Sequence, residues 1–154
     1  MTAMKIDDHK KEYLSLLLLA DESEEMIDRY LATGEMYVFT ENGRIVGECV
    51  VAAGKTECEL KNLAVVPALQ RRGFGRKIVE FVCERYGGRY EELIVGTGEA
   101  PATMGFYRKC GFEEYARIPD FFCEHYDHEI IEDGVKLRDM ILLKRKLDHK
   151  GKRI

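Results

Sequence analysis

Early in the chain, hydrophobic residues recur at the spacing of an amphipathic helix. This spacing occurs twice, first around the apolar run Leu14–Ala20 and again over Met26–Leu31. Side chains three or four positions apart share one face of a helix, so each segment predicts a helix with one buried face. The polar stretch Asp21–Ser23 separates the two helices and Gly34 ends the second, while a short strand near Met4–Ile6 precedes them.

Beyond the second helix the hydrophobic spacing changes to two. Alternation from Met36, the turn sequence Glu41-Asn42-Gly43 and a second apolar run predict a β-hairpin, because Asn-Gly readily adopts the positive φ of a tight turn. The next strand, Cys58–Val66, ends at Pro67.

The second half of the chain alternates between helices and strands. The pattern predicts a helix over Gly73–Tyr86, a strand over Leu93–Thr97 and a helix from Pro101 to Gly111. Two strands follow, one before the segment Asp120–Asp133 and a last one over Asp139–Leu147. The complete order is β-α-α-β-β-β-α-β-α-β-β. This order is typical of an α+β protein with a central, twisted, mostly antiparallel mixed sheet flanked by helices.

Composition and charge narrow the class of protein. The chain has 154 residues, of which 45% are hydrophobic and 34% charged, with a formal net charge of -4. We expect residues 1–154 to form a single domain with a frayed end from about residue 148. A negative net charge argues against nucleic-acid binding, which usually needs a basic face. The apolar run near the N-terminus is too short to cross a bilayer, so no membrane contact is expected.

Cysteine and histidine usage indicates neither disulfides nor a metal site. The five cysteines are odd in number and contain no C-x-x-C pair, which favours a reduced, cytoplasmic protein. His125 and His128 have an H-x-x-H spacing, but no third ligand is spaced to match, so no metal is expected.

A basic turn that contains two glycines, Gln70–Arg76, connects a strand to the start of a helix. Unpaired backbone N–H groups and the positive end of the helix dipole favour an anion at such a position, and glycine lets the backbone approach it closely. The turn is therefore a candidate phosphate site. The alternative is an ordinary helix start whose arginines are solvated.

Two common phosphate-binding patterns do not fit this turn. A P-loop requires G-x-x-x-x-G-K-[ST], and the chain has neither that spacing nor a hydroxyl residue after the lysine. A dinucleotide fingerprint requires a third glycine three residues after Gly75, where this chain has Ile78.

The sequence Q-R-R-G-F-G (Gln70–Gly75) after an apolar strand resembles the acyl-CoA-binding motif of the GNAT superfamily of N-acetyltransferases. The segment GFYRKCGF (Gly105–Phe112) is similar to that family's second signature, a helix with a tyrosine followed by a basic residue and a Gly-aromatic pair. The predicted element order also matches the family's fold, so the resemblance spans about Gly34 to Leu147. It implies acetyl-CoA as co-substrate and a primary amine of a small molecule or protein as acceptor.

The resemblance also implies which residues bind the co-substrate. Backbone groups of the turn would hold the pyrophosphate, and the preceding strand would pair its main chain with the pantetheine arm. The implied residues are Leu63, Ala64 and Val65 for the arm, and Gln70, Arg71, Arg72, Gly73, Phe74, Gly75 and Arg76 for the pyrophosphate. Many relatives have an asparagine shortly before the tyrosine helix. Here that stretch reads G-T-G-E-A-P-A-T, so the contact is missing or made differently.

Two residues are candidates for proton transfer. An amine must lose a proton before it attacks a thioester, and Glu59 is a candidate general base, with Glu57 or an ordered water as alternatives. Strand alternation predicts that Glu59 and Leu63 share one face. The resemblance makes Tyr107 the general acid for the departing thiolate. The structural alternatives are a solvated Glu59 paired with Lys61 and a core aromatic at Tyr107.

The segment Asp120–Asp133 contains no Lys or Arg and is rich in carboxylates and aromatic rings. Such a wall suits a cationic amine, which makes the segment a candidate acceptor site; the alternative is a long loop folded onto the sheet edge. The leading hypothesis is an N-acetyltransferase that acts by direct transfer. The alternative is a non-catalytic acyl-CoA sensor or interaction module. A homodimer is one assembly that the sequence leaves open.

Overall fold

The computed structural model describes residues 1–148, so the predicted frayed end, 148–154, lies outside the described residues except for Asp148. Within this range seven strands form one sheet in the order β1-β2-β3-β4-β5-β9-β6. The neighbours are antiparallel except for β4 and β5, which run parallel. These strands are β1 (Thr2–Ile6), β2 (Glu35–Glu41), β3 (Arg44–Ala53), β4 (Glu57–Val65), β5 (Glu92–Thr97), β6 (Glu113–Ile118) and β9 (Met140–Lys146).

Helices cover both faces of this sheet. They are η1 (Lys10–Tyr13), α1 (Leu14–Leu17), α2 (Glu24–Leu31), η2 (Pro67–Leu69), α3 (Phe74–Tyr86), α4 (Pro101–Lys109) and α5 (Phe121–His125). The predicted α+β fold and order of major elements are confirmed. The helix α5 and the small hairpin β7 (Ile131–Glu132) and β8 (Val135–Lys136) were not predicted, because elements this short show no hydrophobic period. No helix in the described range has the length and apolar character needed to span a membrane.

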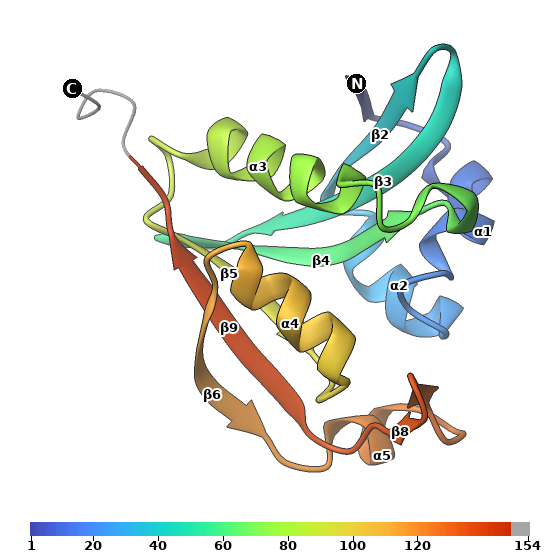
Figure 1. Ribbon diagram of the computed structural model, residues 1–154, viewed down its shortest axis with the longest axis vertical. Coiled ribbons are helices and arrows are strands. Elements are labelled where there is room, and N and C mark those ends of the chain that lie inside the picture. The colour runs from blue at the N-terminus through green and yellow to red at the C-terminus, as the bar shows by residue number, and fades with distance from the viewer. Residues whose placement is uncertain (149–154) are drawn as a thin grey trace.

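The sheet separates two hydrophobic layers. On one face, α1 and α2 pack on β2 and β3 through a cluster that includes Leu17, Ile27 and Val38. On the other face, α3 and α4 share a larger cluster that includes Ile78 and Leu93. Figure 1 shows α3 lying over β2, β3 and β4, with α1 and α2 on the opposite side and α4 against β5 and β9. The central strands of the sheet are therefore covered by helices on both faces.

Local signals set several element boundaries. The Oγ of Ser23 accepts a hydrogen bond from the N–H of Met26 (3.2 Å) and caps α2. Asn42 and Gly43 both have positive φ, 51° and 77°, which confirms the predicted tight hairpin between β2 and β3. After α3, Gly88 has a positive φ of 92°, whereas Gly87, the residue that directly follows the helix, has a φ of -61°.

A β-bulge in β4 overturns the prediction that Glu59 and Leu63 share one face. The register with β3 pairs Leu60 with Val51 but Asn62 with Val50, so Lys61 is an extra residue on β4. A single extra residue reverses the alternation of side chains beyond it. As a result Leu60 and Leu63 both face the α3 side, and Glu59 faces the other side.

The same region is where β4 and β5 separate. The two strands pair only from Glu57–Glu92 to Leu60–Val95. Beyond Leu60, β4 continues to Val65, and the edge that faced β5 has no partner strand among the described residues. In Figure 1 the two parts of the sheet run apart from their common end. A strand edge without a partner presents free N–H and C=O groups to a ligand.

Candidate active site

The start of α3 has the backbone geometry of an anion site. Arg71 and Gly73 have positive φ values of 64° and 86°. The N–H of Lys77 donates to the carbonyl of Gly73 (3.1 Å), so the preceding N–H groups of the first turn have no intrahelical acceptor. These groups, together with the exposed side chains of Arg71, Arg72 and Arg76, can hold a pyrophosphate.

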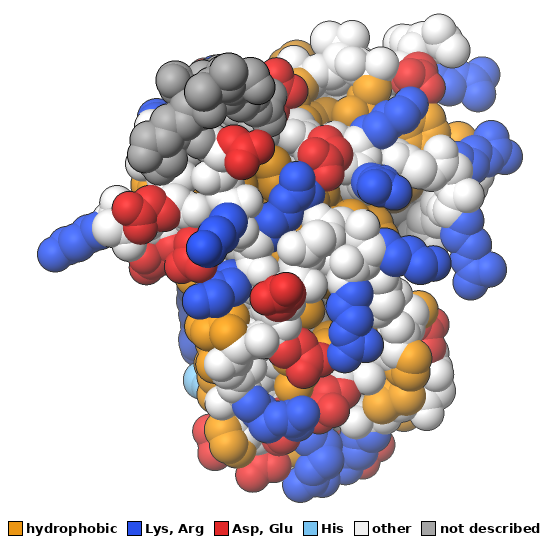
Figure 2. Space-filling view, turned by 60° about the vertical axis from the view of Figure 1, so that its left-hand side comes forward, with side chains coloured by type: hydrophobic (Ala, Val, Ile, Leu, Met, Phe, Trp, Pro, Cys, Tyr) orange, Lys and Arg blue, Asp and Glu red, His pale blue; other side chains and the backbone are white. Residues whose placement is uncertain are grey.

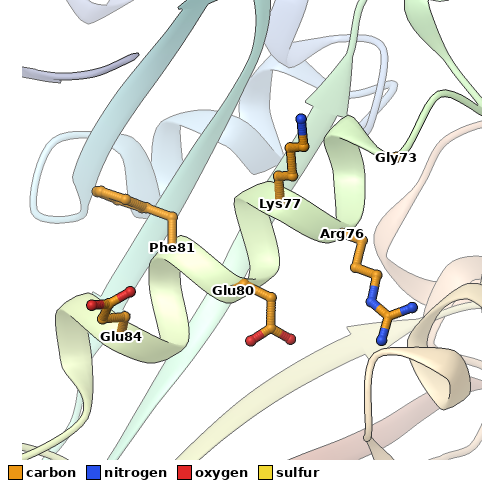
Figure 3. A pocket seen from close by; sticks show the side chains of 6 residues that line it. All are labelled: Gly73, Arg76, Lys77, Glu80, Phe81 and Glu84. Atoms are coloured by element: carbon orange, nitrogen blue, oxygen red, sulfur yellow. The ribbon is translucent and has the colours of Figure 1, made fainter. Parts of the chain in front are cut away.

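A depression of about 530 Å³ runs along α3 and is lined by Gly73, Arg76, Lys77, Glu80, Phe81 and Glu84. In Figure 3, Arg76 and Lys77 project from opposite sides of the helix, so positive charge lies on both sides of its start. Figure 2 shows charges of both signs spread over the surface, with Lys and Arg gathered at the upper right of that view. The cationic region is thus local in a chain of net charge -4.

The free edge of β4 presents two of the three residues assigned to the pantetheine arm. The N–H of Val66 donates to the carbonyl of Val46 on β3 (2.9 Å). Backbone groups of successive strand residues point to alternate sides, so Leu63 and Val65 direct theirs away from β3. Ala64 lies opposite Glu48 and directs its groups towards β3.

Gln70 connects the two predicted co-substrate surfaces. Its Nε2 donates to the carbonyl of Val65 (3.1 Å), which ties the turn to the end of β4. Gly75 allows α3 and α4 to approach closely, because a Cβ at this position would lie 3.1 Å from two ring carbons of Phe106. The turn, the strand edge and α4 therefore meet at one place.

Tyr107 reaches this place from α4. Its ring is 8% exposed and packs edge-on against Phe106 and Phe112, with centroids 5.0 and 5.5 Å away. Burial raises its pKa, and the charges of Cys110, Glu132 and Glu48 raise it further. None of the hydrogen bonds of the described residues involves its hydroxyl. Tyr107 is therefore a neutral phenol whose O–H is free to donate.

Glu59 occupies a different setting from Tyr107. Its Oε2 accepts from the Nζ of Lys61 (3.1 Å), and its side chain is 35% exposed. Glu59 lies near Glu57, Glu92 and Tyr115 on the face of the sheet away from α3. Burial raises the pKa of Tyr115, and the negative charges of these carboxylates raise it further. Glu59 therefore has the geometry expected for the structural alternative, a partly solvated carboxylate paired with Lys61.

Two buried polar side chains were not predicted from the sequence. Glu48 is 0% exposed and Asn62 is 3% exposed, in neighbouring strands β3 and β4. The sequence does contain an indication that Glu48 is unusual, because it is the one charged residue within the apolar stretch from Ile45 to Ala53. For Asn62, alternation alone would predict the same face as Leu60, because a period of two does not reveal the bulge at Lys61.

The acidic segment predicted as an acceptor site packs beside α4. Thr103 of α4 donates through its hydroxyl to Glu132 (2.7 Å), and Phe122 and Ile130 form a small core with Ala100. The hydroxyl of Tyr126 donates to Asp21 in the α1–α2 loop (2.8 Å). Part of the aromatic set is thus structural, as the alternative interpretation expected. Glu99, from the stretch that lacks the asparagine, pairs with Arg117.

Four of the five cysteines, all of them buried or half-buried, do not have the environment of a nucleophile. Burial raises the pKa of Cys58 to about 12 and that of Cys83 to about 11, and it also raises the pKa values of Cys49 and Cys110. A reactive cysteine needs the opposite shift, towards the thiolate. Among the described residues, no group of three or more His, Cys, Asp or Glu is arranged to hold a metal ion. His128 instead contacts Asp127 (2.6 Å) and Glu22 (3.7 Å).

Comparison with known proteins identifies the family. Residues 32–114 match the family model described as the acetyltransferase (GNAT) domain. The chain belongs to the GNAT acetyltransferase family. The predicted family, the predicted enzyme class and acetyl-CoA as the co-substrate of GNAT enzymes are confirmed.

Full-length similarity extends to curated and solved GNAT proteins. The N-acetyltransferase YvbK of Bacillus subtilis (strain 168) is 37% identical over 135 residues, covering 86% of this chain and 87% of YvbK. A GNAT family acetyltransferase from Elizabethkingia anophelis, solved with acetyl-CoA bound, is 34% identical with a TM-score of 0.89, covering 95% of this chain and 97% of that chain. A Bacillus subtilis acetyltransferase in complex with CoA is 34% identical with a TM-score of 0.86, covering 94% and 97%. This GNAT chain therefore matches its relatives over nearly its whole described length.

Proposed function

We propose that this GNAT protein transfers the acetyl group of acetyl-CoA directly to a primary amine of a small molecule or protein. The observation that carries the proposal is the separation of β4 from β5 beside the anion-binding start of α3, with the Tyr107 hydroxyl free at the same place. Leu63 and Val65 bind the pantetheine arm through their backbone groups. The turn from Gln70 to Arg76 binds the pyrophosphate.

Tyr107 donates a hydrogen bond to the sulfur as the thiolate departs. Raised cysteine pKa values favour direct attack by the amine over an acetyl-cysteine intermediate. Family membership favours an enzyme over a non-catalytic acyl-CoA sensor. We infer further that residues 1–154 form one N-acetyltransferase domain and that it works in the cytoplasm, where its free cysteines stay reduced.

The experiment is CoA thiol release from acetyl-CoA with a panel of polyamines, amino acids, aryl-alkyl amines and lysine peptides. Amine-dependent release and an acetylated amine detected by mass spectrometry are expected. Calorimetric binding of acetyl-CoA with no release for any amine would favour the sensor instead.

A further inference from the structure

Glu48 is a carboxyl group enclosed within the sheet and its covering helices. Neither of its oxygens has a hydrogen-bond partner among the described residues. Burial raises its pKa to about 8, against the opposing effect of the nearby backbone N–H of Ala64. A buried polar group without a partner destabilises a fold, so its presence needs a reason other than packing.

Asn62 also has a buried acceptor atom, Oδ1, without a hydrogen-bond partner among the described residues. Its Nδ2 donates to the carbonyl of Leu17 (3.1 Å) and to the hydroxyl of Tyr30 (3.0 Å). These two bonds fix the amide, because a flip would place Oδ1 against the carbonyl of Leu17. The Oδ1 atom is therefore held without a partner in the described part of the chain.

The strand register brings these acceptors together. Glu48 lies opposite Ala64 and Val50 lies opposite Asn62, so Glu48 and Asn62 are diagonal neighbours on adjacent strands. Diagonal neighbours on one face have Cβ atoms roughly 7–8 Å apart, within reach of long side chains. Both face the α1–α2 side, since Val50 packs in that cluster. Three unpaired oxygen atoms therefore line one small region, and all three can accept a hydrogen bond once Glu48 is ionised.

The charged and titratable groups around Glu48 come from three elements. Tyr30 of α2 lies on the same face of the sheet as Glu48, whereas Tyr107 of α4 and Cys49 of β3 belong to the cluster on the opposite face. Burial raises the pKa of each of these three groups, and the charge of Glu48 contributes in each case. Asp21 lies one hydrogen bond beyond Tyr30 (3.2 Å). The charge of Glu48 is therefore felt by Tyr30 on its own face of the sheet and by Tyr107, the phenol assigned to the thiolate, on the other.

We propose that Glu48 and Asn62 form the receptor for the amino group of the acceptor, and that Glu48 removes its proton. An ammonium group has three N–H donors and no acceptor, which matches the three unpaired oxygens. This inference rests on the proposed acetyl transfer, and it names a primary alkylamine as the acceptor class. It also makes Glu48, and not Glu59, the catalytic base.

The proton and bond changes balance. The ammonium gives one proton to the Glu48 carboxylate, and the neutral nitrogen attacks the thioester carbonyl carbon. The new N–C bond forms as the C–S bond breaks. The second proton leaves the nitrogen as the thiolate becomes a thiol, assisted by the Tyr107 hydroxyl. Glu48 then returns its proton to water, so that one amine and one acetyl-CoA give one amide, one thiol and one proton.

Glu48 and Asn62 are buried, so an amine reaches their oxygens only if the segments packed over them move. A chain of hydrogen bonds runs from Asn62 through Tyr30 and Asp21 to Tyr126. It joins β4 to α2, the α1–α2 loop and the segment after α5. The Tyr126–Asp21 bond (2.8 Å) is the link that connects the two outer segments.

The test compares the full-length wild type with Glu48→Gln and Asn62→Ala, with Glu25→Gln on the exposed side of α2 as a matched control. Acetyl-CoA affinity is measured by calorimetry and kcat/KM for the amine by thiol release. We expect acetyl-CoA affinity within about twofold of wild type and a loss of about 100-fold in kcat/KM for Glu48→Gln. Asn62→Ala should act mainly through a higher KM for the amine.

The pH profile separates a base from a purely structural residue. A primary alkylamine with a pKa near 10.4 remains an ammonium ion below about pH 9, so its own titration does not set the profile in that range and Glu48 has a proton to accept. Wild-type kcat/KM should rise with a midpoint near pH 8, because the base must be ionised, and Glu48→Gln should lack this rise. The inference is overturned if Glu48→Gln keeps the rise and the wild-type rate, or if Glu59→Gln removes the rise instead. Failure of the wild type to bind acetyl-CoA, or to acetylate any amine, overturns the proposed function itself.

A melting experiment gives a second readout that does not depend on turnover. Glu48→Met replaces an unpaired buried acid with an apolar side chain of similar length, so its melting temperature should equal or exceed that of wild type, by roughly 2–4 °C. A lower melting temperature would show that Glu48 stabilises the fold, and the receptor assignment would then be wrong.

Discussion

At the scale of single residues, the environment of Tyr107 limits the chemistry that it can perform. Its pKa is raised above the ordinary phenol value by burial and by nearby negative groups. A thiolate of ordinary pKa, about 8.5, cannot take a proton completely from such a phenol. The role that we propose for Tyr107 is therefore to donate a hydrogen bond to charge that develops on the sulfur, which needs the hydroxyl and a fixed ring.

Removing that hydroxyl should affect turnover and little else. For Tyr107→Phe we expect kcat to fall about 100-fold while acetyl-CoA affinity and melting temperature stay near wild type, because the ring contacts with Phe106 and Phe112 remain. Thiol-release kinetics measure the change. Tyr115→Phe on β6, where the ring is 43% exposed, is the matched control. A kcat within twofold of wild type for Tyr107→Phe would contradict the role.

At the scale of elements, we expect the connection from β4 to α3 to bind the pyrophosphate through its backbone more than through its arginines. Gly73 adopts a φ of 86°, and a Cβ at this position would meet no atom within 4 Å. The requirement for glycine is thus conformational, not steric. Exposed arginines near a phosphate contribute little in comparison, since surface ion pairs are screened by solvent.

We expect substitutions in this connection to differ in their effect on acetyl-CoA affinity, measured by calorimetry. Gly73→Val should raise Kd at least about 10-fold, because a left-handed conformation costs an L-residue about 1–2 kcal/mol and the N–H groups lose their alignment. Arg71→Ala should raise Kd only about threefold. Gly43→Val is the matched control, since Gly43 has a similar φ of 77° and open space but lies in the β2–β3 turn. An equal loss for Arg71→Ala and Gly73→Val would show that side-chain charge dominates.

At the scale of the whole molecule, the buried carboxyl of Glu48 links stability to pH. Its pKa in the folded protein, about 8, lies above the unfolded value. The folded state therefore holds the proton more tightly, and stability that is fully present below the unfolded pKa, about 4.3, is lost as pH rises through 8. One group of this kind contributes a slope of at most ~1.4 kcal/mol per pH unit.

The prediction is that the free energy of unfolding falls between about pH 5 and pH 8, and that the fall is smaller in Glu48→Gln. Urea unfolding at several pH values, with fixed ionic strength, measures it. Glu25→Gln should follow the wild-type curve, because that carboxylate is largely exposed. Parallel curves for Glu48→Gln and wild type would show that Glu48 does not titrate in the folded protein.

The sequence by itself determined the order of elements, the hairpin turn at Asn42-Gly43, the basic glycine turn and the family. These features depend on residues close together in the chain, whose period and turn chemistry are readable locally. The tertiary structure alone decided the rest of the site. The bulge at Lys61 turned Glu59 away from Leu63, and pairing of β3 with β4 placed Glu48 beside Asn62. Strand register and burial arise from partners distant in sequence, and no local pattern records them.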